Sequence, residues 1–431
     1  MKRNRRAAAA VGLVLAAGIG LTACGAPNGS ENDIELTLMF WGDDTAPAAW
    51  DEITEAFIAD GHENVSFEYI HQPSEYETKV QTLIAANQSP DVFLINEANV
   101  ARFAADGALL DLGAEWEGLG YDIEAEFTES ATTQWEDATI ALAPNVNAIV
   151  MYYDKAAFDE AGVAYPPTDP AEAWTWQEFT DAAGQLTSGE GDSRNWGAFI
   201  APWMTTWTPF VYSNGGSWWN DDATEFNLDS PEAVEVFEAY QDLYAGDYGV
   251  PYESLNSIGF DVILQSRRTA MFIDGTWNSK VVADSWGEDT GIALIPVFDE
   301  FQSMAITDPL VGGAATEHPE LVAEFIHYVA ANPEKFPGAL GGAPTSLDYL
   351  EGDKQDLWFD ALERPEGYQE TLAATIANSR PHPARSVVSM PEIEFPLVMS
   401  EALLPYFEGE IDDVSGALDA IAPQVETILQ R

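Results

Sequence analysis

Tryptophans and carboxylates are the chemically useful side chains that stand out in this 431-residue chain. Five of the fourteen tryptophans lie between Trp196 and Trp219, a density that core packing does not explain. The chain also holds 73 aspartates and glutamates, and most glycosidases work with a pair of such carboxyl groups. The sequence leaves such a pair open, so a lipid-anchored glycoside hydrolase stays an alternative.

Nucleophilic and metal chemistry have no support in the sequence. The five histidines are scattered, and the His-Glu-x-x-His, Gly-x-Ser-x-Gly and phosphate-loop motifs are absent. His318 stands at the start of an expected helix and His327 lies inside it, which favours structural roles for both. We therefore predict no catalytic residue, no metal site and no cofactor.

The only cysteine, Cys24, closes a secretory leader. Four basic residues precede an apolar run over 7–21, which at 15 residues is shorter than the roughly 20 that a membrane-spanning helix needs. Leu21-Thr22-Ala23-Cys24 resembles a bacterial lipobox, in which the cysteine receives a lipid. We predict a signal peptide over 1–23, a lipid on Cys24, a flexible linker over 24–33, and an extracytoplasmic protein anchored to the cell membrane.

The charge is strongly negative, with 17 basic against 73 acidic residues and a formal net charge of −56. Such a surface repels phosphate backbones and anionic headgroups, so nucleic acid is excluded as a partner and membrane contact is limited to the lipid. With 46% hydrophobic residues the chain can bury a large core, and its length predicts two lobes. We expect a monomer.

Strands and helices alternate near the N-terminus. Strands are predicted over 34–41, 65–70 and 92–95, with helices over 46–59 and 76–87 between them. This order is typical of a mainly parallel sheet, in which ligands bind beyond the carboxyl ends of the strands. Those ends carry Trp41, Asp43, Asp44, Asn96 and Glu97.

A long apolar segment over 140–158, interrupted by Pro144, Asn145 and Asn147, is predicted as one strand that contains a hinge. Helices are predicted to follow over 175–186, 230–244 and 318–331, and most of 391–430 is helical. Short strands are expected over 267–277 and 292–296.

The order of these segments and seven motifs resemble the family 1 extracellular solute-binding proteins, the carbohydrate receptors of ABC importers. The motifs are Phe40-Trp41, Tyr76-Glu77-Thr78-Lys79, Ser89-Pro90-Asp91-Val92, residues 151–162, residues 166–179, Arg268-Thr269-Ala270-Met271 with Gly275-Thr276-Trp277, and His318-Pro319-Glu320 leading into residues 323–326. Within 151–162, Asp154 stands where the family usually has Asn. The likeness runs along nearly all of the chain after the leader.

The resemblance implies an α/β, two-lobed periplasmic-binding-protein-like fold of type II, with a hinge of several chain crossings. The lobes would comprise 34–147 with 299–340, and 148–298 with 341–431. They would close over a small-molecule carbohydrate, an oligosaccharide of two or more units given the tryptophans, and present it to the transmembrane subunits of an ABC permease.

The resemblance also implies a ligand site in which indole rings stack on sugar faces while carboxylates, amides and a guanidinium bond hydroxyls. Its expected members are Trp41, Asp43, Asp44, Asn96, Glu97, Asn147, Trp203, Trp207, Trp218, Trp219, Asp274, Trp277, Asn278, Gly313 and Arg385. Other roles stay open for some of them: each Trp can be core, one of the two aspartates can cap the next helix, and Gly313 can make a turn.

A different cargo on the same fold is the nearest alternative. The acidic composition suits a polyamine or another cation, and ferric ion or peptide also stay open. Salt distinguishes them, because cation binding weakens as ionic strength rises whereas neutral sugar binding barely responds.

Overall fold

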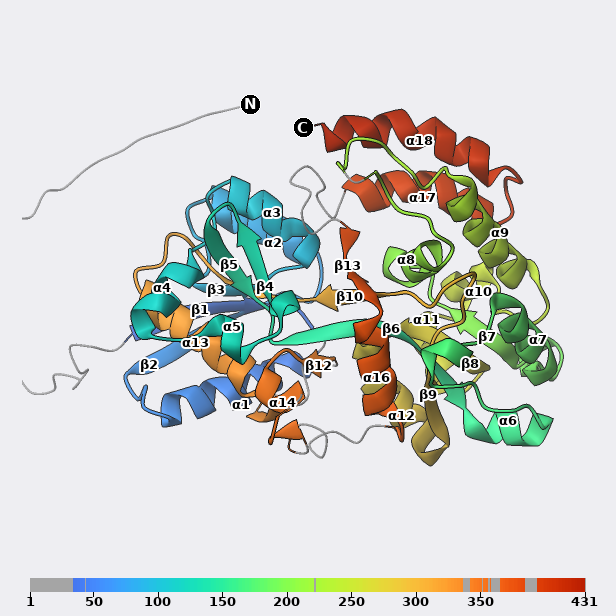
Figure 1. Cartoon of the computed structure of the whole chain (residues 1–431), viewed down its shortest axis with the longest axis horizontal. Helices are drawn as coiled ribbons and strands as arrows, with labels where there is room; N and C mark the ends of the chain where they lie inside the picture. Colours follow the sequence, from blue (N-terminus) through green and yellow to red (C-terminus); the bar gives the residue numbers. More distant parts are fainter. Residues whose placement is uncertain are drawn as a thin grey trace, which may run out of the picture.

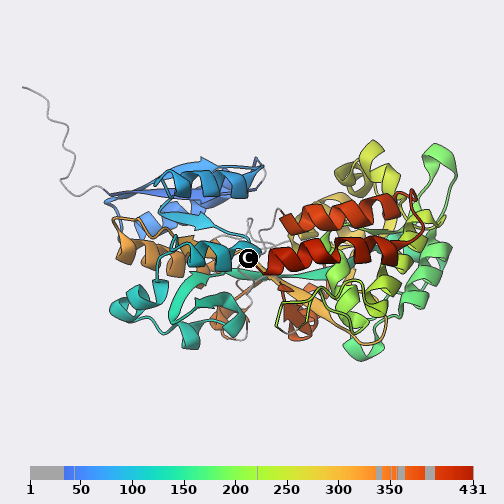
Figure 2. The same cartoon turned by 90° about the horizontal axis from the view of Figure 1, so that it is seen from above.

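The chain forms two α/β lobes connected by several crossings of the backbone, as seen from two directions in Figures 1 and 2. The computed structural model describes residues 34–42, 44–220, 222–335, 342–350, 352–355, 357, 365–383 and 394–430. The predicted signal peptide 1–23, Cys24, the linker 24–33, Asp43 and Arg385 lie outside the described residues. None of the described helices is long and apolar enough to cross a membrane.

The first lobe is built on a sheet whose described strands run in the order β2-β1-β3-β11-β5-β4. Its strands are β1 (Ile34–Phe40), β2 (Val65–His71), β3 (Val92–Leu94), β4 (Thr132–Trp135), β5 (Ala138–Leu142) and β11 (Leu310–Gly312). Its helices are α1 (Ala46–Ala59), α2 (Tyr76–Ala85), α3 (Glu97–Ala105), α4 (Leu112–Leu119), α5 (Ile123–Glu126), α13 (Pro319–Ala331) and α14 (Leu347–Leu350). β1 pairs in parallel with β2 and β3, as predicted for the opening segments. The pairings of β11 with β3 and β5, and of β4 with β5, are antiparallel, so the sheet is mixed and not mainly parallel as predicted.

Apolar spacing explains why the first lobe folds where the sequence predicts. Trp50, Ile53 and Phe57 recur at helical intervals along α1, and all three are buried against the sheet. Gly42, two residues after the end of β1, has φ +125°, and a Cβ there would come within 2.6 Å of the Ala46 Cβ. A tight, glycine-dependent turn therefore leads from the first strand into the first helix.

The second lobe is built on a sheet with the described order β13-β10-β6-β8-β7, and β9 and β12 also pair with β6. Its strands are β6 (Asn145–Asp154), β7 (Trp196–Ile200), β8 (Thr269–Gly275), β9 (Thr290–Ala293), β10 (Ser303–Thr307), β12 (Ala343–Pro344) and β13 (Ser379–Pro381). Its helices are α6 (Lys155–Ala161), α7 (Trp176–Leu186), α8 (Met204–Ser213), α9 (Pro231–Ala245), α10 (Tyr252–Ser257), α11 (Phe260–Gln265), α12 (Ser279–Trp286), α16 (Tyr368–Ala377), α17 (Glu394–Phe407) and α18 (Val414–Leu429). α17 and α18 pack on each other and on α9, so the C-terminal helices belong to this lobe (Figure 1).

The segment over 140–158 is not one strand, as the sequence predicted, but β5, β6 and the start of α6. Pro144 lies between the two strands, where a residue without an N–H donor interrupts the pairing. Asp154 ends β6 because its Oδ1 accepts from the backbone N–H groups of Ala156 and Ala157 at 3.0 and 3.3 Å and so caps α6.

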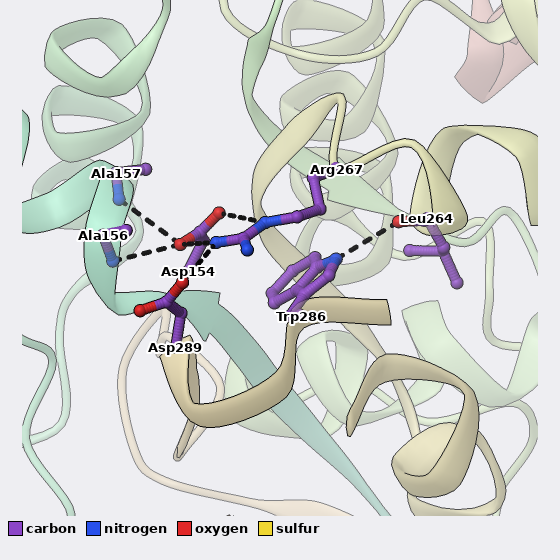
Figure 3. Close-up of polar contacts among 7 residues, drawn as sticks. All are labelled: Asp154, Ala156, Ala157, Leu264, Arg267, Trp286 and Asp289. Atoms are coloured by element: carbon purple, nitrogen blue, oxygen red, sulfur yellow. Dashed lines mark hydrogen bonds and ion pairs between the residues drawn. The ribbon is translucent and has the colours of Figure 1, made fainter. Parts of the chain in front are cut away.

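An ion pair holds this cap in place (Figure 3). Arg267 donates from Nε to Asp154 Oδ2 at 3.0 Å and from Nη2 to Asp154 Oδ1 at 2.6 Å, and its Nη2 also lies 3.1 Å from Asp289 Oδ2. The hydrogen bonds that Arg267 donates to Asp154 and Asp289 raise the pKa of Arg267 above its ordinary value, against the opposing effect of burial. The family usually has Asn at this position. Asp154 is charged instead, and Arg267 supplies the opposite charge.

Strand pairing changes the expected lobe boundaries. β10 lies inside the segment predicted for the first lobe, but Ala305 pairs with Ala148, so this strand belongs to the second sheet. Residues 145–147 also pair there, as part of β6. α14, predicted in the second lobe, contacts α5 of the first, and Phe127 bridges to Ser346. The chain passes to the second sheet at 143–144 and returns at 308–309. It enters the second sheet again at β12, returns to the first lobe at α14, and is in the second lobe from α16 on.

Candidate ligand-binding site

The carboxyl ends of the central strands of both sheets face the hinge. In the first lobe β3 is followed by Ile95, whose N–H donates to the carbonyl of Pro309 in a crossing segment. In the second lobe the last residue of β8, Gly275, lies opposite Ile149 in β6, the strand that begins at the first crossing. In each lobe, the carboxyl ends of the strands, where ligands bind in such sheets, therefore lie on the side that is joined to the other lobe.

The end of β8 brings four predicted site residues together. Asp274 is 1% exposed, and its carboxylate accepts from the Gly275 N–H at 2.7 Å and from Asn278 Nδ2 at 2.9 Å. The Trp203 side chain also lies close enough to Asp274 to lower the pKa of its carboxyl group. Trp203 and Trp277 are 49% and 38% exposed. Two accessible indoles and an amide thus surround one buried carboxylate.

Backbone geometry accounts for this arrangement. Gly275 carries no side chain, and a Cβ there would come within 2.2 Å of the Trp277 ring. The ring therefore lies directly on the backbone at the strand end. Burial raises the pKa of Asp274 to about 7, and the interactions with Gly275, Trp203 and Asn278 oppose that rise.

In the first lobe Trp41 lines a pocket of about 520 Å³ just beyond β1. The pocket is lined by Trp41, Gly42, Pro73, Ser74, Glu75, Tyr76 and Glu77. The ring of Trp41 stands edge-on to that of Tyr76, with centroids 4.8 Å apart and planes at 90°. Asp44 is exposed nearby, in the turn that leads into α1. The carboxylates of Glu75 and Glu77 were not expected in the site, although Tyr76-Glu77 is one of the motifs that carry the resemblance.

Asn96 and Glu97 follow β3 but have structural partners. The Asn96 side chain accepts from the Ala98 N–H at 2.9 Å and caps α3. Glu97 is buried, and its two carboxylate oxygens accept from the N–H and Oγ1 of Thr307 at 3.0 and 2.9 Å. Thr307 belongs to the second sheet. Glu97 was expected to contact ligand, but the structure places it as a link across the hinge.

The tryptophan cluster divides into core and surface. Trp207 and Trp218 are each 1% exposed, and their rings pack in the main core of the second lobe with centroids 5.6 Å apart. The Trp218 indole donates to Thr208 Oγ1 at 3.0 Å. Both rings were expected to stack on ligand, but here their faces are covered by protein. Trp219 is partly buried, edge-on to Trp218, so Trp203 is the most accessible of the cluster.

Asn147 and Gly313 have positions in the framework of the lobes. Asn147 is buried in β6, and its Oδ1 accepts from Thr276 Oγ1 at 2.8 Å, which agrees with a hinge location. At Gly313 a Cβ would come within 2.3 Å of the Pro90 carbonyl oxygen. The backbone at Gly313 was expected to approach a ligand closely, but its close neighbour is the Pro90 carbonyl of the protein itself. Among the described residues, no group of three or more His, Cys, Asp or Glu side chains is arranged to hold a metal ion.

This two-lobed fold, with aromatic and polar groups at facing strand ends, is that of a solute receptor. Residues 41–335 match the family of bacterial extracellular solute-binding proteins. The chain therefore belongs to this family, and its fold is the type II periplasmic-binding-protein fold that the sequence predicted.

Individual relatives are distant. The diacetylchitobiose binding protein DasA of Streptomyces coelicolor is 26% identical over 262 residues, a match that covers 57% of this chain and 57% of that protein. The solved structure of the ABC substrate-binding protein Lmo0181 from Listeria monocytogenes, in complex with cycloalternan, superposes with a TM-score of 0.80 at 18% identity, over 92% of this chain and 99% of that one. UgpB from Mycobacterium tuberculosis, in complex with glycerophosphocholine, gives 0.75 at 17% identity, over 91% and 98%.

Proposed function

We propose that this protein is the lipid-anchored receptor of an ABC importer, which captures a sugar of two or more units between its lobes and delivers it unchanged to the permease. The observation that carries the proposal is the pair of accessible indoles, Trp203 and Trp277, beside the Asp274 and Asn278 polar groups. Sugars combine apolar C–H faces with hydroxyls, and such a surface offers a partner to each. DasA, which is named for diacetylchitobiose, and Lmo0181, which was solved in complex with cycloalternan, support the proposal.

Contact with both lobes is what lets a ligand favour closure. A ligand shifts the lobes towards the closed state only by the difference between its affinities for the two states. Trp41 and the pocket beyond β1 would supply the first-lobe contacts, with Asp44 at the rim. Trp203 and Trp277 would supply those of the second lobe. Trp219, Asp43 and Arg385 stay in the proposal as ligand contacts.

Fluorescence titration tests the proposal directly. Protein that begins at residue 25 is titrated with maltose, maltotriose, N,N′-diacetylchitobiose and a panel of monosaccharides. We expect saturable quenching by at least one oligosaccharide and a loss of affinity of about tenfold in Trp203→Ala and in Trp277→Ala, the order of one aromatic contact. Trp286→Phe is the matched control, since Trp286 is buried under α11 and donates to the Leu264 carbonyl. Quenching by monosaccharides alone, or by none of the sugars, would contradict the proposal.

A cationic cargo is the second candidate, favoured by Glu75 and Glu77 beside Trp41 in the first-lobe pocket. Carboxylates and an aromatic face together suit an amine. Spermidine titration at about 20 and 500 mM salt separates the two cargoes, because screening at high salt weakens only a charge-dependent complex. Binding of spermidine with a steep salt dependence, and none of sugars, would select the cation.

The lipid anchor is tested on the full-length chain. Expression in a bacterium with a lipoprotein pathway should give a membrane-associated protein whose mature N-terminal peptide carries acyl chains on Cys24 by mass spectrometry. Cys24→Ser should release the protein from the membrane without changing its sugar affinity. A mature protein that starts elsewhere, with no acyl group, would contradict the anchor.

A further inference from the structure

We propose that a pocket beside Trp203 is a second part of the ligand site, which takes an uncharged apolar group carried by the sugar. The pocket has a volume of about 230 Å³ and lies where the first residues of α8 and α10 meet α17. It is lined by Pro202, Trp203, Met204, Trp207, Tyr252, Met399, Ser400, Leu403, Leu404 and Phe407. This inference rests on the proposed function, because it concerns which sugars the receptor selects.

Strand pairing places this pocket at the edge of the second sheet that carries the proposed sugar surface. β7 and β8 are parallel neighbours, with Ile200 opposite Ile273, and the N–H of Ala201 donates to the Ile273 carbonyl at 3.3 Å. Trp203 follows the end of β7 and Trp277 follows the end of β8, so both indoles lie at the same edge of the sheet. Because Trp203 lines the pocket and is also 49% exposed, one residue borders both the pocket and the sugar surface.

The lining of the pocket is apolar, although the chain is strongly acidic. None of the described residues that line it carries a charge, in a chain with 73 aspartates and glutamates. The inner part is formed by buried side chains, namely Trp207, Met399, Leu403 and Phe407. The mouth is open to solvent, because Leu404 is 36% exposed and Ser400 is also exposed. A concave apolar surface that stays in contact with water is typical of a binding site.

Size and chemistry indicate one kind of occupant, a compact apolar group of about six carbons. A dry apolar cavity of about 150 Å³ is enough to hold a benzene molecule, and this pocket is larger. Met204 and Met399 contribute flexible thioether side chains, which adapt to groups of different shape. A charged group would lose its hydration there without gaining a partner of opposite charge. A sugar stacked on Trp203 would bring its substituent to the mouth of the pocket.

The first test needs no sugar. In ¹³C-methyl methionine NMR spectra, substitution of Met204, Met399 and Met304 by Leu identifies each resonance by its loss. We expect n-hexanol to shift the Met204 and Met399 resonances in a saturable way and to leave that of Met304, in the core of the second lobe, in place. Ser400→Phe puts a ring at the mouth and should abolish both shifts. Gln424→Phe, exposed on α18 and outside the pocket, is the matched control and should preserve them.

The second test measures whether an apolar group linked to a sugar enters the pocket. Maltose is compared with n-hexyl maltoside and with maltose 6′-O-hexanoate, which carry the chain at opposite ends, and the same derivatives are made of N,N′-diacetylchitobiose. Burial of one methylene changes affinity about fourfold, so even partial entry should make one derivative bind at least about tenfold tighter than its parent sugar. This gain should disappear in Ser400→Phe and persist in Gln424→Phe.

The outcomes distinguish failure of this inference from failure of the proposed function. If no parent sugar or derivative binds, the sugar function fails, while the hexanol titration still decides whether the pocket takes an apolar group. Unmoved Met204 and Met399 resonances, or an equal shift at Met304, would overturn the inference. So would a sugar site at which neither derivative gains over its parent, or at which the gain survives in Ser400→Phe. If Ser400→Phe does not fold, Leu404→Trp at the same mouth replaces it.

Discussion

The ion pair between Asp154 and Arg267 gives the most quantitative prediction for stability. Asp154 makes two kinds of interaction. Its side chain caps α6 by accepting from Ala156 and Ala157, and both of its oxygens bind the Arg267 guanidinium. Replacement by Ala removes both tasks, whereas replacement by Asn keeps a cap and removes the charge. The comparison of the two variants therefore separates the cap from the ion pair.

The magnitudes follow from burial. Loss of an N-cap side chain costs about 1 kcal/mol. Removal of one partner from a fully buried ion pair costs about 3–5 kcal/mol. The Asp154 side chain is 9% exposed but that of Arg267 is 32% exposed, and Arg267 keeps Asp289 as a partner. We therefore reduce the ion-pair contribution to about 2 kcal/mol. Asp154→Asn is expected to lose about 2 kcal/mol and Asp154→Ala about 3 kcal/mol.

Equilibrium urea unfolding, followed by circular dichroism, measures these losses as shifts of the midpoint at constant slope. The matched control is Lys280→Ala, which breaks the exposed pair with Asp284 on α12 and should cost less than about 0.5 kcal/mol. Equal losses in Asp154→Asn and Asp154→Ala would show that the cap contributes nothing. A loss in Asp154→Asn no larger than in the control would refute the assignment of the ion pair.

Three further predictions concern the hinge, the first turn and pH. Glu97→Ala should lower the free energy of unfolding by about 2 kcal/mol in urea unfolding, because it leaves the N–H and hydroxyl of Thr307 without this acceptor, and a loss below that of Lys280→Ala would contradict the link. Gly42→Ala should cost at least about 2 kcal/mol in thermal unfolding, since φ +125° is strained for alanine; an unchanged melting temperature would show that the turn can relax. Burial raises the pKa of Asp274 to about 7 in the folded chain, from an ordinary value of 3.8, so the folded state holds the proton more tightly. Its contribution to stability is therefore present at low pH and is lost as pH rises through 7, and Asp274→Asn should flatten the curve of unfolding free energy between pH 4 and 7 by about 1 kcal/mol per pH unit. An identical curve for the variant would show that Asp274 does not titrate in this range.

Local patterns were sufficient to predict most of the elements and the family. The strand, helix and strand that open the first lobe follow from apolar spacing within each segment, and the structure has them at β1, α1 and β2. Such patterns act within a few residues of the chain, which is why they can be recognised in one sequence. The segment over 140–158 was misjudged because its apolar content fits a strand throughout, whereas the side chain of Asp154 ends the strand and starts a helix.

The site was predicted only in outline, because burial depends on contacts between distant segments. Trp203 and Trp207 are four residues apart and would share a face on a regular helix. Trp203, however, lies just before α8 in extended backbone, so one ring is accessible and the other is core. Trp277 lies on the backbone of Gly275 and Asn278 donates to Asp274, whereas Trp203 is 71 positions from Asp274, and no spacing rule places it near that carboxyl group.

The hinge and the proposed ligand surface share a structural element. Thr276 lies between Asp274 and Trp277, and its hydroxyl donates to Asn147 Oδ1 in β6 at 2.8 Å and accepts from the Ala148 N–H at 3.3 Å. β6 is the strand that follows the first crossing from one lobe to the other. A ligand held by Trp277 thus contacts a segment that is bonded directly to the hinge strand. Closure depends on the difference in ligand affinity between the open and closed states. Because Thr276 is bonded to β6, ligand contact at Trp277 can be coupled to the relative orientation of the two lobes through one pair of hydrogen bonds.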